Sequence, residues 1–278
     1  MNDMFLENQN EMHPKKVRPA NGTLWLSSAF QLFRASPLPW LASMAIMTVI
    51  LLVLIVIPLV QLLAIIATPV FGGGIMFGCW QQRKGHGFQL AFLFKGFEQQ
   101  FGQLMIVGLI YLAATLVASM LAAKLAILLG YPISEIDPQA IASGNIELQP
   151  LLMALAVTML LMLLLMLPVF MAYWFAPALV ILNHVTPLEA MKLSFRACTV
   201  NMLPFLIYGL VAIGIIFGVL TIVVLLSLLL PPLSVFFSLL ANLFLVSLFM
   251  GSMYTSYADI FSQELISDSD DESTSILA

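Results

Sequence analysis

The sequence predicts an all-α polytopic membrane protein, with six transmembrane helices in three hairpins and an amphipathic interfacial helix before each hairpin. Composition is the first reason: 62% of the 278 residues are hydrophobic and 9% are charged, against roughly 45–50% and about 25% in soluble domains. Spacing is the second reason, because apolar runs of about twenty residues recur, the length that crosses roughly 30 Å of hydrocarbon as a helix.

Six apolar runs follow one another, and prolines mark the turns inside two of the hairpins. Pro58 suits the tight turn of the first hairpin, and Pro231 with Pro232 suits that of the third, because proline lacks an N–H and clashes with the preceding helical turn. The spans are expected at 38–58, 60–81, 103–127, 152–178, 203–229 and 233–258.

The fourth apolar run, 151–182, is longer than a bilayer requires, so it must tilt or bend. Pro168 and Pro177 are the expected kinks, since proline interrupts the hydrogen bonds of a helix. An alternative with seven spans would split this run at Pro168. It would also move Lys192 and Arg196 to the outer side, and the charge distribution disfavours that placement.

Nine of the ten Lys and Arg residues lie beside the apolar runs and only on alternate sides of them. Cytoplasmic loops of membrane proteins hold the excess of Lys and Arg. We therefore expect both termini in the cytoplasm. The nine residues are Lys15, Lys16, Arg18, Arg34, Arg83, Lys84, Lys95, Lys192 and Arg196.

Three segments, 23–36, 88–101 and 187–199, place apolar residues on one helical face and polar or basic residues on the other. Such helices lie in the membrane interface with the basic face toward the headgroups. Each carries an aromatic–basic pair at its centre and leads into a hairpin, which favours three copies of one unit. The alternative is that any segment beside a membrane tends to be amphipathic and basic. The expected headgroup contacts are Arg34, Lys95, Lys192 and Arg196.

The chain divides into a membrane domain, 23–261, and two polar ends. Residues 1–22 and the acidic tail 262–278 are expected to be disordered and cytoplasmic, because they have little apolar surface to bury.

Glycines gather in two of the spans. Gly72, Gly73, Gly74 and Gly78 lie in the second span, and Gly214 and Gly218 lie in the fifth. Small residues four apart let helix backbones approach each other closely. The alternative for the second span is a broken helix whose freed carbonyls line a solute or ion path, as in transporters.

Several motifs resemble those of an uncharacterised family of bacterial six-span inner-membrane proteins, and the resemblance covers about residues 14–262. It implies the six-span fold and a bacterial inner-membrane location, and it brings no established activity and no functional residues. The motifs are Arg18-Pro19-Ala20, Gly22, Trp25-Leu26, Phe30, Leu32-Phe33-Arg34, Pro37, Trp40, Leu93-Phe94-Lys95-Gly96-Phe97 and Trp174-Phe175-Ala176-Pro177-Ala178-Leu179.

No catalytic, metal or nucleotide motif accompanies these spans. His13, His86 and His184 lack the spacing of a metal site. We therefore predict a non-enzymatic structural or interaction protein, without cofactor or nucleic acid, that contacts membrane lipids, other membrane proteins or a second copy of itself. The alternative is a transporter for a small or lipid-like solute, with a path near Gly72–Gly74.

Overall fold

The computed structural model describes residues 13–57, 60–131 and 148–261, and this part of the chain contains helices and no strand. Six of the helices are long and apolar enough to cross a membrane, which confirms the predicted all-α class with six spans. Their boundaries lie within a few residues of the expected spans, except that the fourth span divides in two. The spans are α3 (Pro37–Val56), α4 (Gln61–Gln81), α6 (Phe101–Leu128), α8 (Leu148–Tyr173) continued by α9 (Ala176–Asn183), α11 (Met202–Leu229) and α12 (Ser234–Phe261).

Two shorter helices occupy segments that the sequence places in the interface: α2 (Asn21–Ala35) and α10 (Pro187–Val200). Each buries one face, and their position in the interface stays a prediction. A short 3-10 turn, η4 (Pro231–Leu233), joins α11 to α12.

The expectation of a single helix over 88–101 is wrong. A π-helical turn, η1 (Gln82–His86), ends α4, and a 3-10 helix, η2 (Leu90–Phe94), and a short helix, α5 (Lys95–Gln99), follow. Gly85 and Gly87 have positive φ angles, which reverse the chain after α4. The chain then returns directly against α4, where the carbonyl oxygens of η2 face a glycine.

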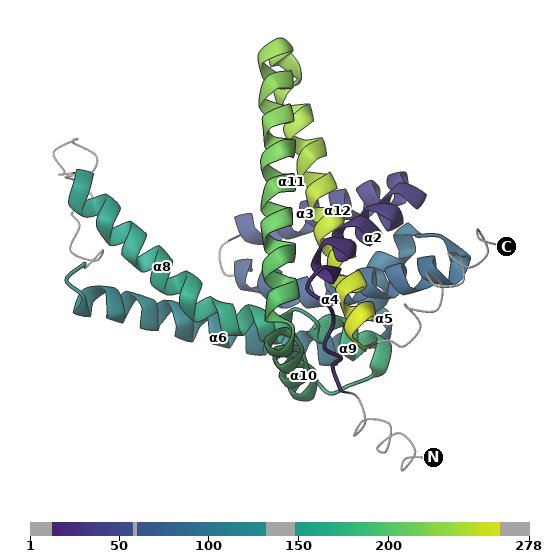
Figure 1. The fold of residues 1–278 in the computed structure, drawn as a ribbon, viewed down its shortest axis with the longest axis horizontal. Coiled ribbons are helices and arrows are strands. Elements are labelled where there is room, and N and C mark those ends of the chain that lie inside the picture. Colours follow the sequence, from purple (N-terminus) through teal and green to yellow (C-terminus); the bar gives the residue numbers. More distant parts are fainter. Residues whose placement is uncertain (1–12, 58–59, 132–147, 262–278) are drawn as a thin grey trace.

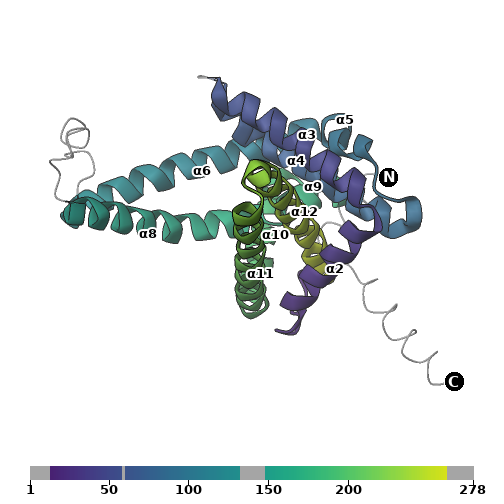
Figure 2. The same cartoon turned by 90° about the horizontal axis from the view of Figure 1, so that it is seen from above.

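Consecutive spans pack against each other as pairs, α3 with α4, α6 with α8, and α11 with α12. The pairs diverge from a shared centre: α6 and α8 extend to one side while α11 and α12 stand away from them (Figure 1). From above, α3 and α4 take a third direction (Figure 2). The molecule therefore has three arms, and the long helices α8 and α11 are mostly exposed along their length.

The segments before each pair connect the arms in a cyclic order. The η2 and α5 segment packs mainly on α4 of the first pair, and α10 packs on α8 and α9 of the second pair. The first segment, α2, packs on α12 and α11 of the last pair, so the order closes into a ring. Each connecting segment thus packs mainly on the second span of a pair, as three copies of one unit would.

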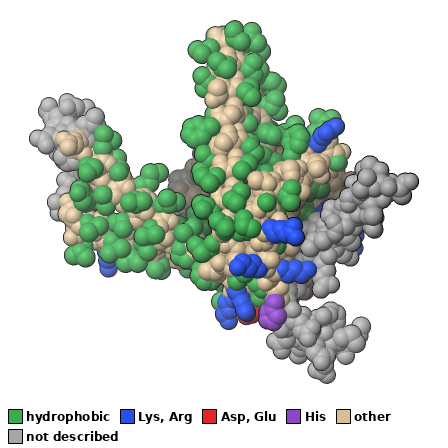
Figure 3. Space-filling model, viewed as in Figure 1, with side chains coloured by type: hydrophobic (Ala, Val, Ile, Leu, Met, Phe, Trp, Pro, Cys, Tyr) green, Lys and Arg blue, Asp and Glu red, His purple; other side chains and the backbone are tan. Residues whose placement is uncertain are grey.

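The core lies where the arms meet, and α4 is its most buried span. On the face shown in Figure 3, apolar side chains cover the projecting arms, and most of the visible Lys and Arg side chains lie around the lower part of the molecule. Exposed apolar surface of this extent is expected where the surroundings are lipid rather than water.

The segment before α2 is ordered against the core, so the expectation of disorder over residues 1–22 is wrong for 13–22. The backbone N–H of Lys15 donates to the carbonyl oxygen of Ile260 at 3.0 Å, which holds this segment against the last turn of α12. The two ends of the described chain therefore adjoin. Residues 1–12 and the acidic tail 262–278 lie outside the described residues.

Candidate functional site

A large apolar cleft lies between α8 and α11, with α10 at its base. Its volume is about 640 Å³. The two spans that form its walls diverge away from α10 (Figure 1), so the cleft lies between two of the arms. Its lining residues are Leu167, Phe170, Met171, Trp174, Cys198, Met202, Leu203, Phe205, Leu206 and Tyr208.

A break in the fourth span shapes the base of this cleft. The helix runs without interruption through Pro168, stops at Tyr173 and resumes as α9, in which Pro177 is the second residue. Ser194 of α10 holds the break: its Oγ accepts a hydrogen bond from the Phe175 N–H at 2.9 Å and donates one to the Met171 carbonyl at 2.7 Å. One buried hydroxyl thus bridges the backbone N–H and the carbonyl that the break separates.

Trp174 lies between the large cleft and α12. Its Nε1–H donates to Ser256 Oγ of α12 at 3.2 Å, and its ring meets Phe205, Tyr208 and Phe249 edge-on at centroid distances of 5.4–5.7 Å. The Tyr208 hydroxyl pairs in turn with Ser252 Oγ at 2.8 Å. Because these polar atoms are satisfied on the side of α12, apolar surface dominates the lining of the cleft.

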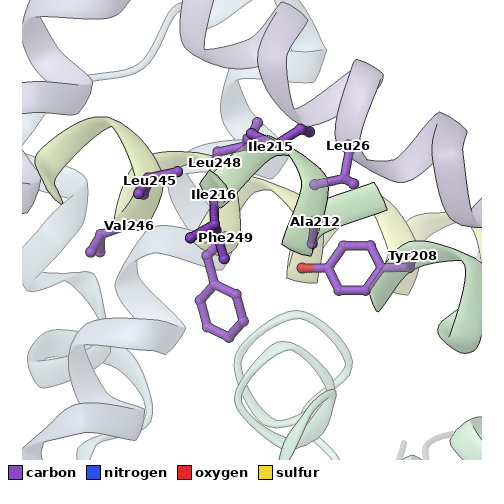
Figure 4. A pocket seen from close by; sticks show the side chains of 9 residues that line it. All are labelled: Leu26, Tyr208, Ala212, Ile215, Ile216, Leu245, Val246, Leu248 and Phe249. Carbon is purple, nitrogen blue, oxygen red and sulfur yellow. The ribbon is translucent and has the colours of Figure 1, made fainter. Parts of the chain in front are cut away.

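A second, smaller cleft of about 280 Å³ lies farther along α11, where this helix faces α12 and α2. Figure 4 shows its lining side chains: Leu26 of α2, residues of α12, and a face of α11 that includes Tyr208. Tyr208 lines both clefts, so it forms part of the wall between them.

Cys198 is the thiol that lines the large cleft, and its Sγ–H points to the Met171 carbonyl at 3.5 Å. Burial in apolar surroundings raises the pKa of Cys198 to about 12. The thiol is therefore neutral at physiological pH and a poor nucleophile. Cys79, in α4, is also buried, and neither cysteine forms a disulfide.

The described residues hold no group of three or more His, Cys, Asp or Glu side chains that could bind a metal ion. The described His184 is exposed, and its Nδ1 lies 2.6 Å from Gln100 Nε2.

The glycines of the second span lie inside a continuous, buried helix. A side chain at Gly74 would overlap the carbonyl oxygens of Phe92 and Leu93 in η2, and one at Gly73 would come within 2.8 Å of Leu104. Gly72 faces Pro177 of α9, and Gly78 faces Phe88.

The glycines of the fifth span have different surroundings. Gly214 and Gly218 face open space on α11, with no atom of the described chain within 4 Å of an added Cβ.

The four bases predicted to contact headgroups lie on α2, α5 and α10. Arg34, Lys192 and Arg196 are exposed and Lys95 is half-buried. Two of them pair with acids on their own helices: Lys95 with Glu98, and Lys192 with Glu189 at 3.5 Å. Lys192 and Arg196 lie one turn apart on α10, whereas Arg34 and Lys95 lie on other segments.

Sequence analysis missed three polar residues that join segments far apart in the chain. Asp259 Oδ2 accepts hydrogen bonds from Asn21 and Trp25, and Asn201 holds the segment before α2. Gln82 accepts from the Trp40 indole at 3.1 Å and donates to a carbonyl of α2 at 2.7 Å. Each of the three is a polar residue at the end of an apolar run. This pattern alone does not predict a long-range contact, because ordinary exposed helix ends have it too.

The fold defines a multi-pass membrane protein, and a comparison with known proteins agrees with this class. The chain is 24% identical over 219 residues, 73% of its length, to a protein of Burkholderia thailandensis described as a probable inner membrane protein, of which the match covers 77%. No protein-family model and no solved structure matches the chain.

Proposed function

We propose that this protein is a non-enzymatic protein of the bacterial inner membrane that binds lipid, with an acyl chain in the cleft between α8 and α11. The observation that carries the proposal is the character of this cleft. Its walls are two spans that face hydrocarbon, and nearly all of its lining surface is apolar.

The size of the cleft supports an organic occupant rather than an ion or a water cluster. Pockets for small ligands have volumes of about 300–1,000 Å³ and are mostly apolar, and this cleft, at about 640 Å³, lies within that range. An unfilled void would leave the lining side chains without dispersion partners. Lipid tails are the molecules that surround these walls in a membrane, so an acyl chain is the occupant that the surroundings supply.

Lys192 and Arg196 on α10 support a lipid with an anionic headgroup. Both bases are exposed on the helix that forms the base of the cleft. A basic residue near the surface of an anionic leaflet contributes about 1 kcal/mol to membrane attraction. In this proposal the headgroups meet the outer face of α10 while one chain enters the cleft.

The alternative of a transporter with a path beside Gly72–Gly74 requires a break in α4. That helix is continuous from Gln61 to Gln81, and side chains and carbonyls of neighbouring segments pack against its glycines. Both clefts described above lie along α11 instead. The geometry therefore favours lipid binding over transport through α4.

A photoreactive phospholipid with a diazirine in its acyl chain tests the proposal. In lipid nanodiscs we expect labelling of peptides from α8 and α11, and we expect Leu206→Trp, which fills the cleft, to reduce it several-fold. Leu225→Trp is the matched control, because Leu225 is equally exposed on α11 and lies outside the cleft (55% against 59% for Leu206). Equal labelling of both variants would refute a bound chain in the cleft.

A further inference from the structure

The segment 13–20 forms a fixed basic strap. It crosses the molecule where the end of α10 and the last turn of α12 lie. Lys15 donates its N–H to Ile260 of α12 at 3.0 Å, and the Val17 N–H donates to Asn201 Oδ1 at 2.9 Å. The Asn201 side chain returns a bond from Nδ2 to the Lys15 carbonyl at 2.9 Å. Asn201 is fully buried, so the strap is tied to the core at two successive points.

The strap presents three positive charges in four residues: Lys15, Lys16 and Arg18. Lys16 and Arg18 are exposed, and Lys15 is half-buried. None of the three makes an ion pair with another described residue. Asp259, the acid of α12, accepts its hydrogen bonds from Asn21 and Trp25 instead of from these bases.

The acidic end of the chain begins beside this strap. Residues 262–278 carry five acids and no base: Glu264, Asp268, Asp270, Asp271 and Glu272. They follow Phe261, the residue after the strap's contact at Ile260. Seven residues of extended chain reach at most about 25 Å, so Asp268 can reach every base of the strap.

We propose that the acidic tail, residues 264–272, binds the basic strap of its own chain. The tail is tethered at the strap, which gives it an effective concentration on the order of millimolar for this contact. The anionic surface of the cytoplasmic leaflet repels the same acids, so the strap is the favourable place for them. Because Asn201 already fixes the strap, binding carries no entropy cost for ordering the strap itself. The consequence is that the tail shields the strap from competing anions.

Disulfide trapping in the full-length protein tests this contact. Lys16→Cys with Ser269→Cys should form an intramolecular disulfide under mild oxidation at low ionic strength. The native thiols do not compete, because Cys79 and Cys198 are 0% and 4% exposed. Lys124→Cys with Ser269→Cys is the matched control, because Lys124 is also an exposed base but lies near the far end of α6.

The dependence of the trapping rate on charge distinguishes a tail that binds the strap from a tail that is only tethered close to it. At 1 M salt the screening length falls to about 3 Å, and the trapping rate should drop several-fold. Replacing Asp268, Asp270, Asp271 and Glu272 with Asn or Gln should give the same drop. Equal rates for the acidic and the neutral tail, or no disulfide in any condition, would overturn the proposal.

The lipid composition of the nanodisc identifies the occupant of the strap. The trapping rate should be similar in neutral and in anionic nanodiscs if the tail holds the strap. Loss of trapping in anionic nanodiscs, with trapping retained in neutral ones, would assign the strap to headgroups and refute binding by the tail. Leu206→Trp should leave trapping unchanged, so this result is independent of the cleft.

Discussion

The indole N–H of Trp25 donates to Oδ2 of Asp259 at 2.7 Å, and 234 residues of sequence separate the two. This bond joins the first connecting helix to the last span. Asn21 Nδ2 donates to the same oxygen at 2.9 Å, so one carboxylate holds two donors of α2.

Replacing Asp259 with Ala should lower the free energy of unfolding by about 1–3 kcal/mol, because it leaves the buried indole N–H without an acceptor. Asp259→Asn keeps an oxygen at the same place and should cost less. Thermal unfolding in detergent measures both changes. If Asp259→Ala is no less stable than Asp259→Asn, the bond does not hold α2 to α12.

Gly74→Ala should destabilise the protein by about 1–3 kcal/mol, the usual cost of overpacking. The added methyl would meet the carbonyls of Phe92 and Leu93, which cannot move without displacing η2. Gly214→Ala, in the fifth span α11, is the control, because an added Cβ meets open space there. That variant should be neutral or slightly more stable, because Ala favours a helix over Gly. The same unfolding assay compares them, and equal losses would contradict close packing at Gly74.

Ser194→Ala should also cost about 1–3 kcal/mol, because the Phe175 N–H and the Met171 carbonyl would lose their shared partner. Ser27→Ala provides the control, since Ser27 makes an exposed bond to Leu24 that water can replace. Unfolding temperature and photolabelling of the cleft are the two measurements. A stable Ser194→Ala variant with normal labelling would show that the break needs no support from α10.

Alkylation of Cys198 should be slow at pH 8 and should accelerate as the pH rises. Burial raises the pKa of its thiol to about 12. The reactive thiolate is thus a minor species at pH 8 and grows tenfold with each pH unit below the pKa. Maleimide labelling of the Cys79→Ala variant, followed by intact mass, gives the pH profile. Fast labelling at pH 7 in the folded protein would show that the thiol is accessible and ionised.

Reporter fusions test the orientation that the Lys and Arg distribution predicts. A fusion at Glu264 should report the cytoplasm and one at Asp137 the periplasm. The hydrogen bond between Lys15 and Ile260 supports a shared side for the two ends of the described chain. A periplasmic signal at Glu264 would reverse the orientation of all three arms.

The spans could be predicted from sequence because each depends on local composition alone. The segment 88–101 could not, because its periodicity fits a helix while its path depends on contact with Gly74 in α4. The same limit applies to Asp259, since nothing near residue 259 indicates that its partners are Asn21 and Trp25. Long-range contacts decide both cases, and hydrophobic periodicity carries no information about them.

The glycines and the large cleft also depend on long-range contacts that the sequence does not indicate. Gly74 with Gly78 and Gly214 with Gly218 carry the same four-residue spacing in sequence, yet the first pair packs against neighbouring segments and the second faces open space. The large cleft was not predictable, because its lining residues are ordinary apolar residues of spans. The divergence of α8 from α11 creates the cleft, and that divergence is a property of the assembled arms.

The position of α2 against α12 affects the order in which the protein can be completed during synthesis. The ribosome releases α2 first and its two main partners, α11 and α12, last, so α2 lacks both until the fifth and sixth spans have entered the bilayer. Until then its buried face, with Trp25 and Leu26, must rest on lipid or on an insertion factor. A nascent chain that stops before α12 therefore leaves this face without the acceptor of Trp25, Asp259, and only α11 of the last pair remains to cover it.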